Sequence, residues 1–418
     1  MSHTVEILSV GTELLLGNIV NLDAQILSQG LSALGLNVYW HTVVGDNPQR
    51  AREAVAAAKG RADIIITTGG LGPTCDDLTK NVLAEAFGKK LVFHEPSAQR
   101  IRNYFARTGR PMTENNLQQA MLPEGCTVLV NDWGTAPGCA FSAGGVTAVL
   151  LPGVPSECRY LAEHCLLPYL ARLHGQVIRS HDLRIFGLTE PQVQELLSDL
   201  LRREDDLTLA PYAGTGEVSL HLSARAADEA ACEARMAPLL AEVRQRLGGC
   251  LYGEDISGLE EAVFRLCRDR HLTLSAAESC TGGLIAKRLT DVPGASQIFL
   301  GGVVSYTNEV KNHVLGVPAS LLEAYGAVSA PVARAMAVGV RVLTGSDLAL
   351  SVTGLAGPGG DDQGTPVGTV FTALSAPEGI FVRRLTLGGS RERIRVLSAH
   401  HAYDLLRRYL TDQMTEGE

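Results

Sequence analysis

The sequence predicts an α/β protein with two doubly wound three-layer α/β/α domains joined by a small α+β domain. Two stretches alternate short apolar runs with amphipathic segments, the pattern of strands and helices around a parallel sheet. Between them, alternating residues on either side of a Gly-Thr-Gly turn at 214–216 predict a β-hairpin. At 418 residues the chain is too long for one ordinary core. We therefore expect domains at 1–170, 171–252 and 253–412, and a tail at 413–418.

Composition indicates a globular protein. Hydrophobic residues make up 45% of the chain and charged residues 19%, as in ordinary soluble domains. The net charge of −9 argues against general nucleic-acid binding, which depends on basic contacts to phosphate. No apolar run is long enough to cross a bilayer, and the first residues resemble neither a signal nor a transit peptide. We expect a cytoplasmic protein with no membrane partner.

The nine cysteines are odd in number, scattered and without CxxC spacing. This pattern disfavours a zinc site or a disulfide framework and is typical of reduced thiols in a cytosolic protein. One of them, Cys280, lies beside Ser279 and is either a rival nucleophile or a small buried residue.

The first third of the chain predicts one of the two three-layer α/β/α domains. Buried strands are expected at 5–10, 38–44, 63–68 and 146–151. Helices are expected at 23–34, 50–59 and 79–87. Because ligands of doubly wound sheets bind at the carboxyl ends of the strands, the loops that follow these strands are the candidate site.

The GGLGPTCDD loop at 69–77 is the strongest candidate in this third. Its glycines can free backbone N–H groups to surround a phosphate. Asp76 and Asp77 could hold a divalent metal that bridges phosphate oxygens, or could simply cap the following helix. The Pro-Gly-Val-Pro turn at 152–155 could form the opposite wall of the same cleft, or be only a stiff turn.

The middle segment carries no obvious catalytic group. Thr189 and the proline two residues later predict the start of a helix that ends near Leu201, and a second helix is expected at 228–247. The segment is acidic around 204–206 and has no Gly-rich phosphate loop. We expect a spacer or a dimerisation module.

The last third is organised around SAAESCTGG at 275–283, which reads as a tight small-residue loop between a short apolar strand at 272–274 and a helix that starts at 284. Ser279 and Thr281 place two hydroxyl groups in the loop, and Gly282 and Gly283 allow a ligand to come close to the backbone. A hydroxyl beside the N–H groups of a helix's first turn can be a nucleophile next to an oxyanion hole. Alternatively, these residues are only good turn and cap formers.

Two further predicted strands, 297–306 and 347–352, end in loops at the same edge of the sheet. A serine nucleophile needs a base, and these loops hold no histidine, but Lys311 can serve if its pKa is lowered. Tyr306 could relay the proton or orient the serine. Each residue has a plainer alternative, Lys311 as a solvated surface charge and Tyr306 as a core residue with a wet hydroxyl.

The same loops offer groups that could bind an anion. Thr353 and the N–H groups of TGLAGPGG at 353–360 could bind an oxyanion or a phosphate. Arg391 and Arg395 lie one helical turn apart and could pair with a phosphate, or could form a solvated helix face.

Four motifs of the first third carry a family resemblance: GTELLLGNIVN, GGLGPTCDD, GTAPG and LPGVPSE. Together they resemble the molybdopterin-binding-like domain at the front of the CinA (competence/damage-inducible) family. The resemblance implies metal-dependent hydrolysis of the pyrophosphate of ADP-ribose, with Asp76 as a metal ligand and the metal not identified. It further implies ligand contacts from Glu13, Gly69, Gly70, Gly72, Thr74 and Gly153. In the same family the middle segment resembles a KH-type domain.

The last third resembles the nicotinamide-nucleotide amidase domain of the PncC type through ESCTGG, SYTNEVK, TGLAGPGG and TPVGTV. The resemblance implies hydrolysis of nicotinamide mononucleotide to nicotinic acid mononucleotide and ammonia, without a metal. Ser279 matches the nucleophile, and Tyr306 and Lys311 match the activating pair. The expected substrate contacts are Thr281, Gly282, Gly283, Thr353, Gly354, Gly357, Arg391 and Arg395. A departure is Gln363-Gly364-Thr365 before Pro366, where many relatives have Lys-Pro.

These resemblances lead to one expected function and one rival. We expect a homodimeric enzyme with two active clefts whose partners are small nucleotides. The family name, which refers to DNA uptake and damage, leaves open an adapter that binds a recombination protein and uses its pockets only for ligand sensing.

Overall fold

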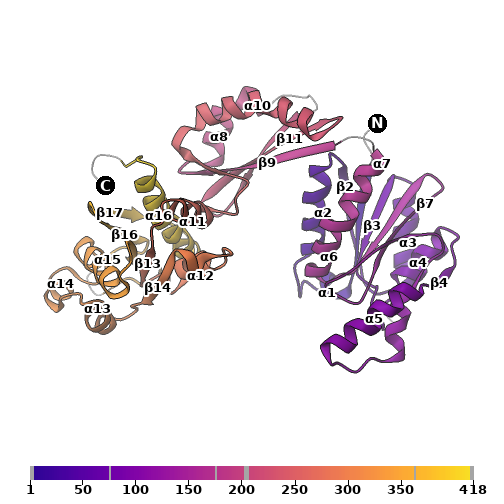
Figure 1. Cartoon of the computed structure of the whole chain (residues 1–418), viewed down its shortest axis with the longest axis horizontal. Coiled ribbons are helices and arrows are strands. Elements are labelled where there is room, and N and C mark those ends of the chain that lie inside the picture. The colour runs from indigo at the N-terminus through magenta and orange to yellow at the C-terminus, as the bar shows by residue number, and fades with distance from the viewer. Residues whose placement is uncertain (1–3, 75–76, 175–176, 202–206, 362–363, 415–418) are drawn as a thin grey trace. The chain divides into compact units, whose positions relative to one another are not determined.

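The computed structural model describes residues 4–74, 77–174, 177–201, 207–361 and 364–414. The chain divides into two compact units, residues 1–180 with 223–235 and residues 181–222 with 236–418 (Figure 1). The predicted α/β class is confirmed, with two mixed sheets flanked by helices and a smaller four-stranded sheet. The division into two units is coarser than the three expected domains, whose boundaries stay predictions.

The sheet of the first unit has the strand order β2-β1-β3-β8-β7-β6. The four strands β2, β1, β3 and β8 run parallel, and β7 and β6 join antiparallel. Their bounds are β1 Thr4–Val10, β2 Asn37–Val44, β3 Ile64–Thr68, β6 Thr127–Leu129, β7 Gly138–Ala143 and β8 Val146–Leu151. The parallel arrangement places the carboxyl ends of β1, β3 and β8 side by side.

Both faces of this sheet are covered by helices. Neighbouring residues of one strand point to opposite faces, so Ile7 packs with Leu27 of α2 whereas Leu8 packs with Val55 of α3. The helical segments of the unit are α1 Thr12–Leu15, α2 Leu22–Ala33, α3 Pro48–Lys59, α4 Thr79–Ala86, α5 Glu95–Thr108, η1 Glu114–Ala120, α6 Pro155–Leu161, η2 Ala162–Leu166 and α7 Leu167–His174. A short antiparallel pair, β4 Leu91–Phe93 and β5 Met121–Pro123, completes it.

The middle sheet has the order β10-β11-β9-β12. Its strands are β9 Val177–Phe186, β10 Leu207–Ala213, β11 Glu217–Ala226 and β12 Leu251–Glu254, and its helical segments are α8 Glu190–Leu196, α9 Ser198–Leu201, α10 Glu229–Leu247 and η3 Gly248–Cys250. The expected hairpin is the β10–β11 pair. The expected helix start at Thr189 is present as a capping box with Gln192, but the predicted single helix is broken at Leu197, which separates α8 from α9.

The sheet of the last third has the order β14-β13-β15-β16-β17. Strand β13 lies between β14 and β15 and runs parallel to both, while β16 and β17 are antiparallel. The strands are β13 Leu274–Glu278, β14 Phe299–Val304, β15 Leu348–Gly354, β16 Thr369–Ala376 and β17 Gly379–Thr386. The helical segments are α11 Leu259–Asp269, α12 Leu284–Thr290, η4 Ala295–Gln297, α13 Asn308–Leu315, α14 Ala319–Tyr325, α15 Ala330–Thr344 and α16 Arg391–Leu410.

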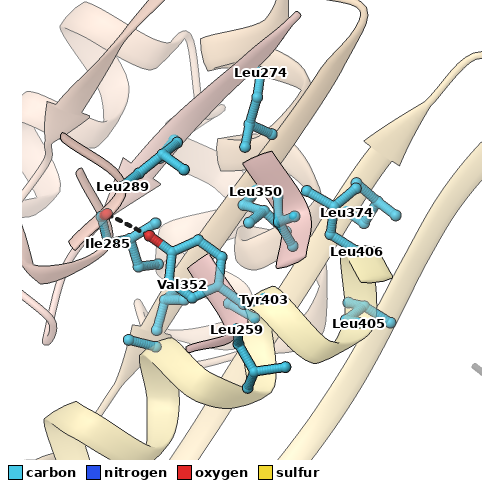
Figure 2. Close-up of a cluster of buried hydrophobic side chains, with 14 of the residues drawn as sticks. Leu259, Leu274, Ile285, Leu289, Leu350, Val352, Leu374, Tyr403, Leu405 and Leu406 are labelled. Atoms are coloured by element: carbon cyan, nitrogen blue, oxygen red, sulfur yellow. Dashed lines mark hydrogen bonds between the residues drawn. The ribbon is translucent and has the colours of Figure 1, made fainter. Parts of the chain in front are cut away.

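The core on one face of this sheet is formed by strand residues and helices α11, α12 and α16 (Figure 2). Leu274, Leu350 and Val352 are buried there beside Tyr403. The Tyr403 hydroxyl donates to the carbonyl of Ile285 at 2.5 Å, which ties α16 to α12. On the other face, Ala277 and Ala349 pack with residues of α15. The strands that carry the candidate loops are therefore fixed from both sides.

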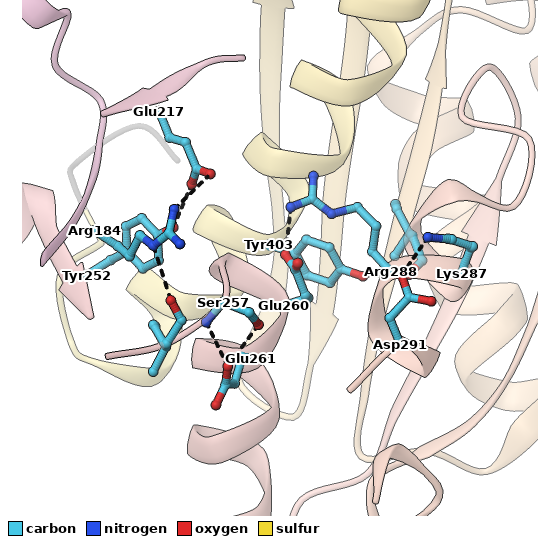
Figure 3. A network of polar contacts seen from close by, with 12 residues as sticks. Arg184, Glu217, Tyr252, Ser257, Glu260, Glu261, Lys287, Arg288, Asp291 and Tyr403 are labelled. Atoms are coloured by element: carbon cyan, nitrogen blue, oxygen red, sulfur yellow. Dashed lines mark hydrogen bonds and ion pairs between the residues drawn. The ribbon is translucent and has the colours of Figure 1, made fainter. Parts of the chain in front are cut away.

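Polar side-chain pairs lie at the edge of this core and link neighbouring elements (Figure 3). Arg288 of α12 forms an ion pair with Glu260 of α11 at 2.7 Å, and both side chains are largely buried. The hydroxyl of Tyr252 donates to Glu217 at 2.6 Å. Within the described residues, no helix combines the length and apolar content that a membrane crossing requires.

Candidate functional site

The nucleophile candidate Ser279 lies directly after β13, the strand between β14 and β15. Because all three strands are parallel, the loops after them meet at one edge of the sheet. Ser279 is buried, and its N–H donates to the carbonyl of Val352 in β15 at 3.0 Å. Gly282 and Gly283 both have positive φ angles, 58° and 95°, which glycine adopts without strain. The loop therefore turns sharply into α12.

Lys311 reaches this hydroxyl from α13. Its Nζ lies 3.1 Å from Ser279 Oγ and donates to the carbonyl of Ser305 at 2.7 Å. Thr307 caps α13 by accepting the N–H of Val310, which sets the direction of the helix. Lys311 is only 1% exposed, so the alternative of a solvated surface charge is wrong. Burial lowers the pKa of its amine to about 8.

Glu278 organises the loop, and the sequence analysis did not single it out. Its buried carboxylate accepts the N–H groups of Gly283, Ile285 and Ala286 at 2.9, 3.1 and 2.9 Å. Ile285 and Ala286 lie in the first turn of α12, whose N–H groups were expected to face a ligand, so that expectation is wrong for these two groups; Gly283 is the N-cap residue. The available signal was a carboxylate just before a Gly-rich helix start, where it complements the helix dipole.

Arg395 and Arg391 of α16 donate hydrogen bonds to backbone carbonyl groups of the site loops. Arg395 donates to the carbonyls of Cys280 at 3.1 Å and Thr281 at 2.7 Å. Arg391 donates to the carbonyl of Gly357 and, at 3.0 Å, to the hydroxyl of Tyr306. Tyr306 is 59% exposed, so it is not the core residue of the plainer alternative. The structure thus brings Lys311, and not Tyr306, to hydrogen-bond distance of Ser279.

The two threonines predicted to contact substrate differ in their surroundings. The hydroxyl of Thr353 donates to the carbonyl of Ala327 at 2.7 Å, so a ligand role at this position would fall to the backbone. The hydroxyl of Thr281 is fully buried and has no hydrogen-bond partner among the described residues.

Gly354 and Gly357 pack against β16 and Val367, where a Cβ atom would lie within 3 Å of neighbouring atoms. They are needed for packing whether or not they bind a ligand.

Cys280 is a poor rival to Ser279. Its side chain is buried, and burial raises the pKa of its thiol to about 11. The thiolate is the reactive form of cysteine, so at neutral pH this side chain is an unreactive thiol.

The first unit holds a separate cavity of about 440 Å³ where β1, β3 and β8 end. Five of the predicted ligand residues line it: Glu13, Gly69, Gly70, Gly72 and Gly153. A Cβ atom on Gly69 would lie 2.2 Å from the carbonyl oxygen of Val10, so only glycine fits there. Thr74 does not line the cavity, and Asp76 lies outside the described residues.

Asp77 uses part of the hydrogen-bonding capacity of the glycine loop. The Asp77 carboxylate accepts the N–H of Gly72 at 2.8 Å and both the N–H and the hydroxyl of Thr74 at 2.8 and 2.5 Å. One glycine N–H that was expected to face a phosphate, that of Gly72, is therefore used within the loop. Asp77 acts as the organiser of its own turn.

Three family models match consecutive parts of this chain. They are described as probable molybdopterin binding domain, residues 6–172, damage-inducible protein CinA KH domain, residues 180–253, and CinA C-terminal domain, residues 256–410. A putative competence-damage inducible protein of Acetivibrio thermocellus is 48% identical over 97% of this chain and 98% of its own length. The chain belongs to the CinA family.

Two further proteins are similar to this chain. A CinA-like protein of Dictyoglomus turgidum is 47% identical over 97% of this chain and 98% of its own. Among solved structures, the competence/damage inducible protein CihA from Agrobacterium tumefaciens is 37% identical, with a TM-score of 0.35; the similarity covers 37% of this chain and 98% of that protein.

The CinA resemblance implies a divalent metal, which needs several grouped ligands. Within the described residues, no three His, Cys, Asp or Glu side chains are grouped closely enough to hold a metal ion. Both oxygens of Asp77 already accept hydrogen bonds. The described residues therefore do not form a metal site by themselves.

Proposed function

We propose that the CinA C-terminal domain of this chain hydrolyses the carboxamide of nicotinamide mononucleotide, giving nicotinic acid mononucleotide and ammonia. The observation that carries the proposal is the 3.1 Å approach of the buried Lys311 amine to the Ser279 hydroxyl. In such a pair the serine hydroxyl can act as the nucleophile, and the desolvated lysine amine can act as the base that removes its proton. The substrate itself comes from the resemblance to the PncC-type amidases.

The reaction then follows from proton transfers between two side chains. Neutral Lys311 accepts the proton of Ser279 Oγ as the oxygen attacks the carboxamide carbon. The lysine ammonium returns that proton to the leaving nitrogen, and ammonia departs from an acyl-Ser279 ester. Lys311 next removes a proton from a water molecule that attacks the ester, which releases the carboxylate and restores Ser279. The hydroxyl of Thr281, which has no hydrogen-bond partner in the described part of the chain, is the side-chain donor that we assign to the developing oxyanion.

Ammonia release by the full-length protein tests this proposal. The wild type should release ammonia from nicotinamide mononucleotide. Ser279→Ala should lower kcat by about 10³-fold or more, because the nucleophile is removed, whereas Cys280→Ala should stay active. Wild-type rates in Ser279→Ala, with the activity lost in Cys280→Ala instead, would assign the nucleophile to the thiol.

A second activity is proposed for the cavity of the first unit, namely metal-dependent cleavage of ADP-ribose. Its support is the agreement between the CinA-type motifs and the five predicted residues that line the cavity. AMP formation from ADP-ribose, with magnesium or manganese added or chelated, is the test. Asp76→Ala should abolish metal-dependent turnover, and unchanged turnover would place the metal elsewhere. The homodimer and the adapter role remain predictions, and sedimentation velocity of the full chain tests the first.

A further inference from the structure

Two cysteines of the first unit lie next to each other where β6 pairs with β7. The antiparallel pairing sets Val128 opposite Cys139, and Cys126 precedes Val128 by two residues. Since alternate residues of a strand share a face, Cys126 and Cys139 are diagonal neighbours on the same face of the sheet. Both belong to the core on that face, where Cys139 is 1% exposed and Cys126 is half-buried.

The two thiols interact directly. A hydrogen bond from the Cys139 thiol lowers the pKa of Cys126 despite its partial burial, and the same bond together with burial raises the pKa of Cys139 well above the usual range. The sulfur nearer to solvent is therefore the one that ionises first. Both side chains are free thiols in this structure.

Lys89 brings a positive charge to this pair. Its Nζ donates to the carbonyl of Glu124 at 2.8 Å and lies 5.1 Å from the centre of the Phe141 ring. Phe141 is two residues beyond Cys139 and so lies on the same face of the sheet. The lysine charge also lowers the pKa of Cys126. A partly accessible thiol beside a cation is the type of cysteine that oxidants attack.

We propose that Cys126 and Cys139 form a reversible disulfide bond when the protein meets a hydroperoxide. The Cys126 thiolate attacks one oxygen of hydrogen peroxide and breaks the O–O bond. Cys126 becomes a sulfenic acid, and the hydroxide that leaves takes a proton from solvent to form water. The Cys139 sulfur then attacks the Cys126 sulfur and loses its proton, which leaves with the sulfenic oxygen as a second water. The two sulfurs give up two electrons to the peroxide, and a thiol reductant restores both thiols.

The disulfide closes a covalent ring around one wall of the cavity in the first unit. The ring contains β6 and the loop at 130–137, and Thr135 and Ala136 of this loop line the cavity. Asn131 in the same loop donates to Glu157, which also lines the cavity, at 2.5 Å. Oxidation therefore restrains a segment that the reduced protein holds only by non-covalent contacts. This inference depends on neither of the two proposed activities.

Peptide mapping of the oxidised full-length protein tests the inference. The protein is treated with hydrogen peroxide at pH 7.5, the remaining thiols are blocked with N-ethylmaleimide, and the chain is digested without reductant. A protease that cleaves before aspartate separates the two cysteines, because it yields peptides 77–131 and 132–181. Mass spectrometry should find these two peptides joined through Cys126 and Cys139, and dithiothreitol should release them.

Single substitutions test the order of the two steps. In Cys139→Ser, the Cys126 side chain should stop at the sulfenic acid, which dimedone traps; Cys139→Ala is the second variant if serine does not fold in the core. In Cys126→Ser, the buried Cys139 should remain a thiol. Cys165→Ser is the matched control: it removes a half-buried thiol of the same unit that donates to the carbonyl of Val130 at 3.6 Å. This control should form the link in wild-type yield.

Three results would overturn the proposal. The first is oxidation of Cys126 to the sulfinic acid in the wild type with no linked peptide, and the second is a link from Cys126 mainly to another cysteine. The third is loss of the Cys139 thiol at the wild-type rate in Cys126→Ser, which would make Cys139 the attacking sulfur. Amide hydrogen exchange at 130–137 should slow on oxidation of the wild type but not of Cys139→Ser, and unchanged exchange in the linked protein would refute the restraint on the loop.

Discussion

Among single residues, the amine of Lys311 decides whether Ser279 can react. Only its neutral form can accept a proton, and burial lowers its pKa to about 8. We predict that kcat/KM for nicotinamide mononucleotide rises with pH and levels off above about 8. Initial rates from pH 6 to 10 give the profile. A rate that is independent of pH across that range would show that Lys311 is not the base.

The same shift predicts a pH-dependent stability. The folded-state pKa lies below the unfolded value of 10.5, so between pH 8 and 10.5 the unfolded chain binds the extra proton. The free energy of unfolding of the wild type, relative to Lys311→Met, should therefore rise by about 3 kcal/mol as pH increases through this window. Parallel denaturant titrations at pH 7.5 and 10 measure the difference. A constant difference would mean that the amine is not desolvated.

Of the structural elements, the start of α12 shows how the nucleophile loop keeps its shape. The carboxylate of Glu278 binds three N–H groups of the turn that follows Ser279. Its carbonyl accepts the N–H of Ser305 at 2.7 Å, and Ser305 in turn accepts from Lys311. One residue thereby links the loop of the nucleophile to the residue that orients the base.

Glu278→Gln tests this link. The glutamine amide replaces one carboxylate oxygen with an NH₂ group, which cannot accept hydrogen bonds from the backbone N–H groups that face it. We predict that kcat falls about 10- to 100-fold while KM changes less than about threefold, and that stability falls by about 1–3 kcal/mol. The apparent pKa of the rate profile should stay near that of the wild type. Glu323→Gln, on an exposed face of α14, is the control. A wild-type kcat in Glu278→Gln would show that the Glu278 carboxylate is not needed to position Ser279 for the reaction.

The sequence predicted the elements better than the directions of their side chains. Strands β1, β3, β8, β14 and β15 follow from mainly apolar runs, and the meeting of three loops follows from parallel pairing. Strand β13 continues to Glu278, into the segment that was expected to be loop. Which hydrogen bonds form was not readable, because that depends on loop backbone angles. Asp77 accepts hydrogen bonds from its own loop, Thr353 donates to Ala327 and Arg395 donates to Thr281. Thr353 and Arg395 had been expected to contact substrate, whereas Asp77 had been left open between a metal ligand and a helix cap.

At the scale of the whole molecule, the two candidate sites lie in separate compact units. The site in the last third depends on Ser279 and Lys311, and the site in the first unit is the cavity lined by residues of the CinA-type motifs. A protein with two independent chemistries should lose one by substitution without losing the other. Asp76→Ala should therefore keep wild-type ammonia release, and Ser279→Ala should keep wild-type affinity for ADP-ribose.

The most direct test of the central claim is the rate of ammonia release from nicotinamide mononucleotide by Lys311→Met at pH 8.5, compared with the wild type. The account predicts a loss in kcat of about 10³-fold, because the hydroxyl of Ser279 would have no base within reach. A variant that retains a rate within threefold of the wild type would contradict the pairing of the buried amine with the serine.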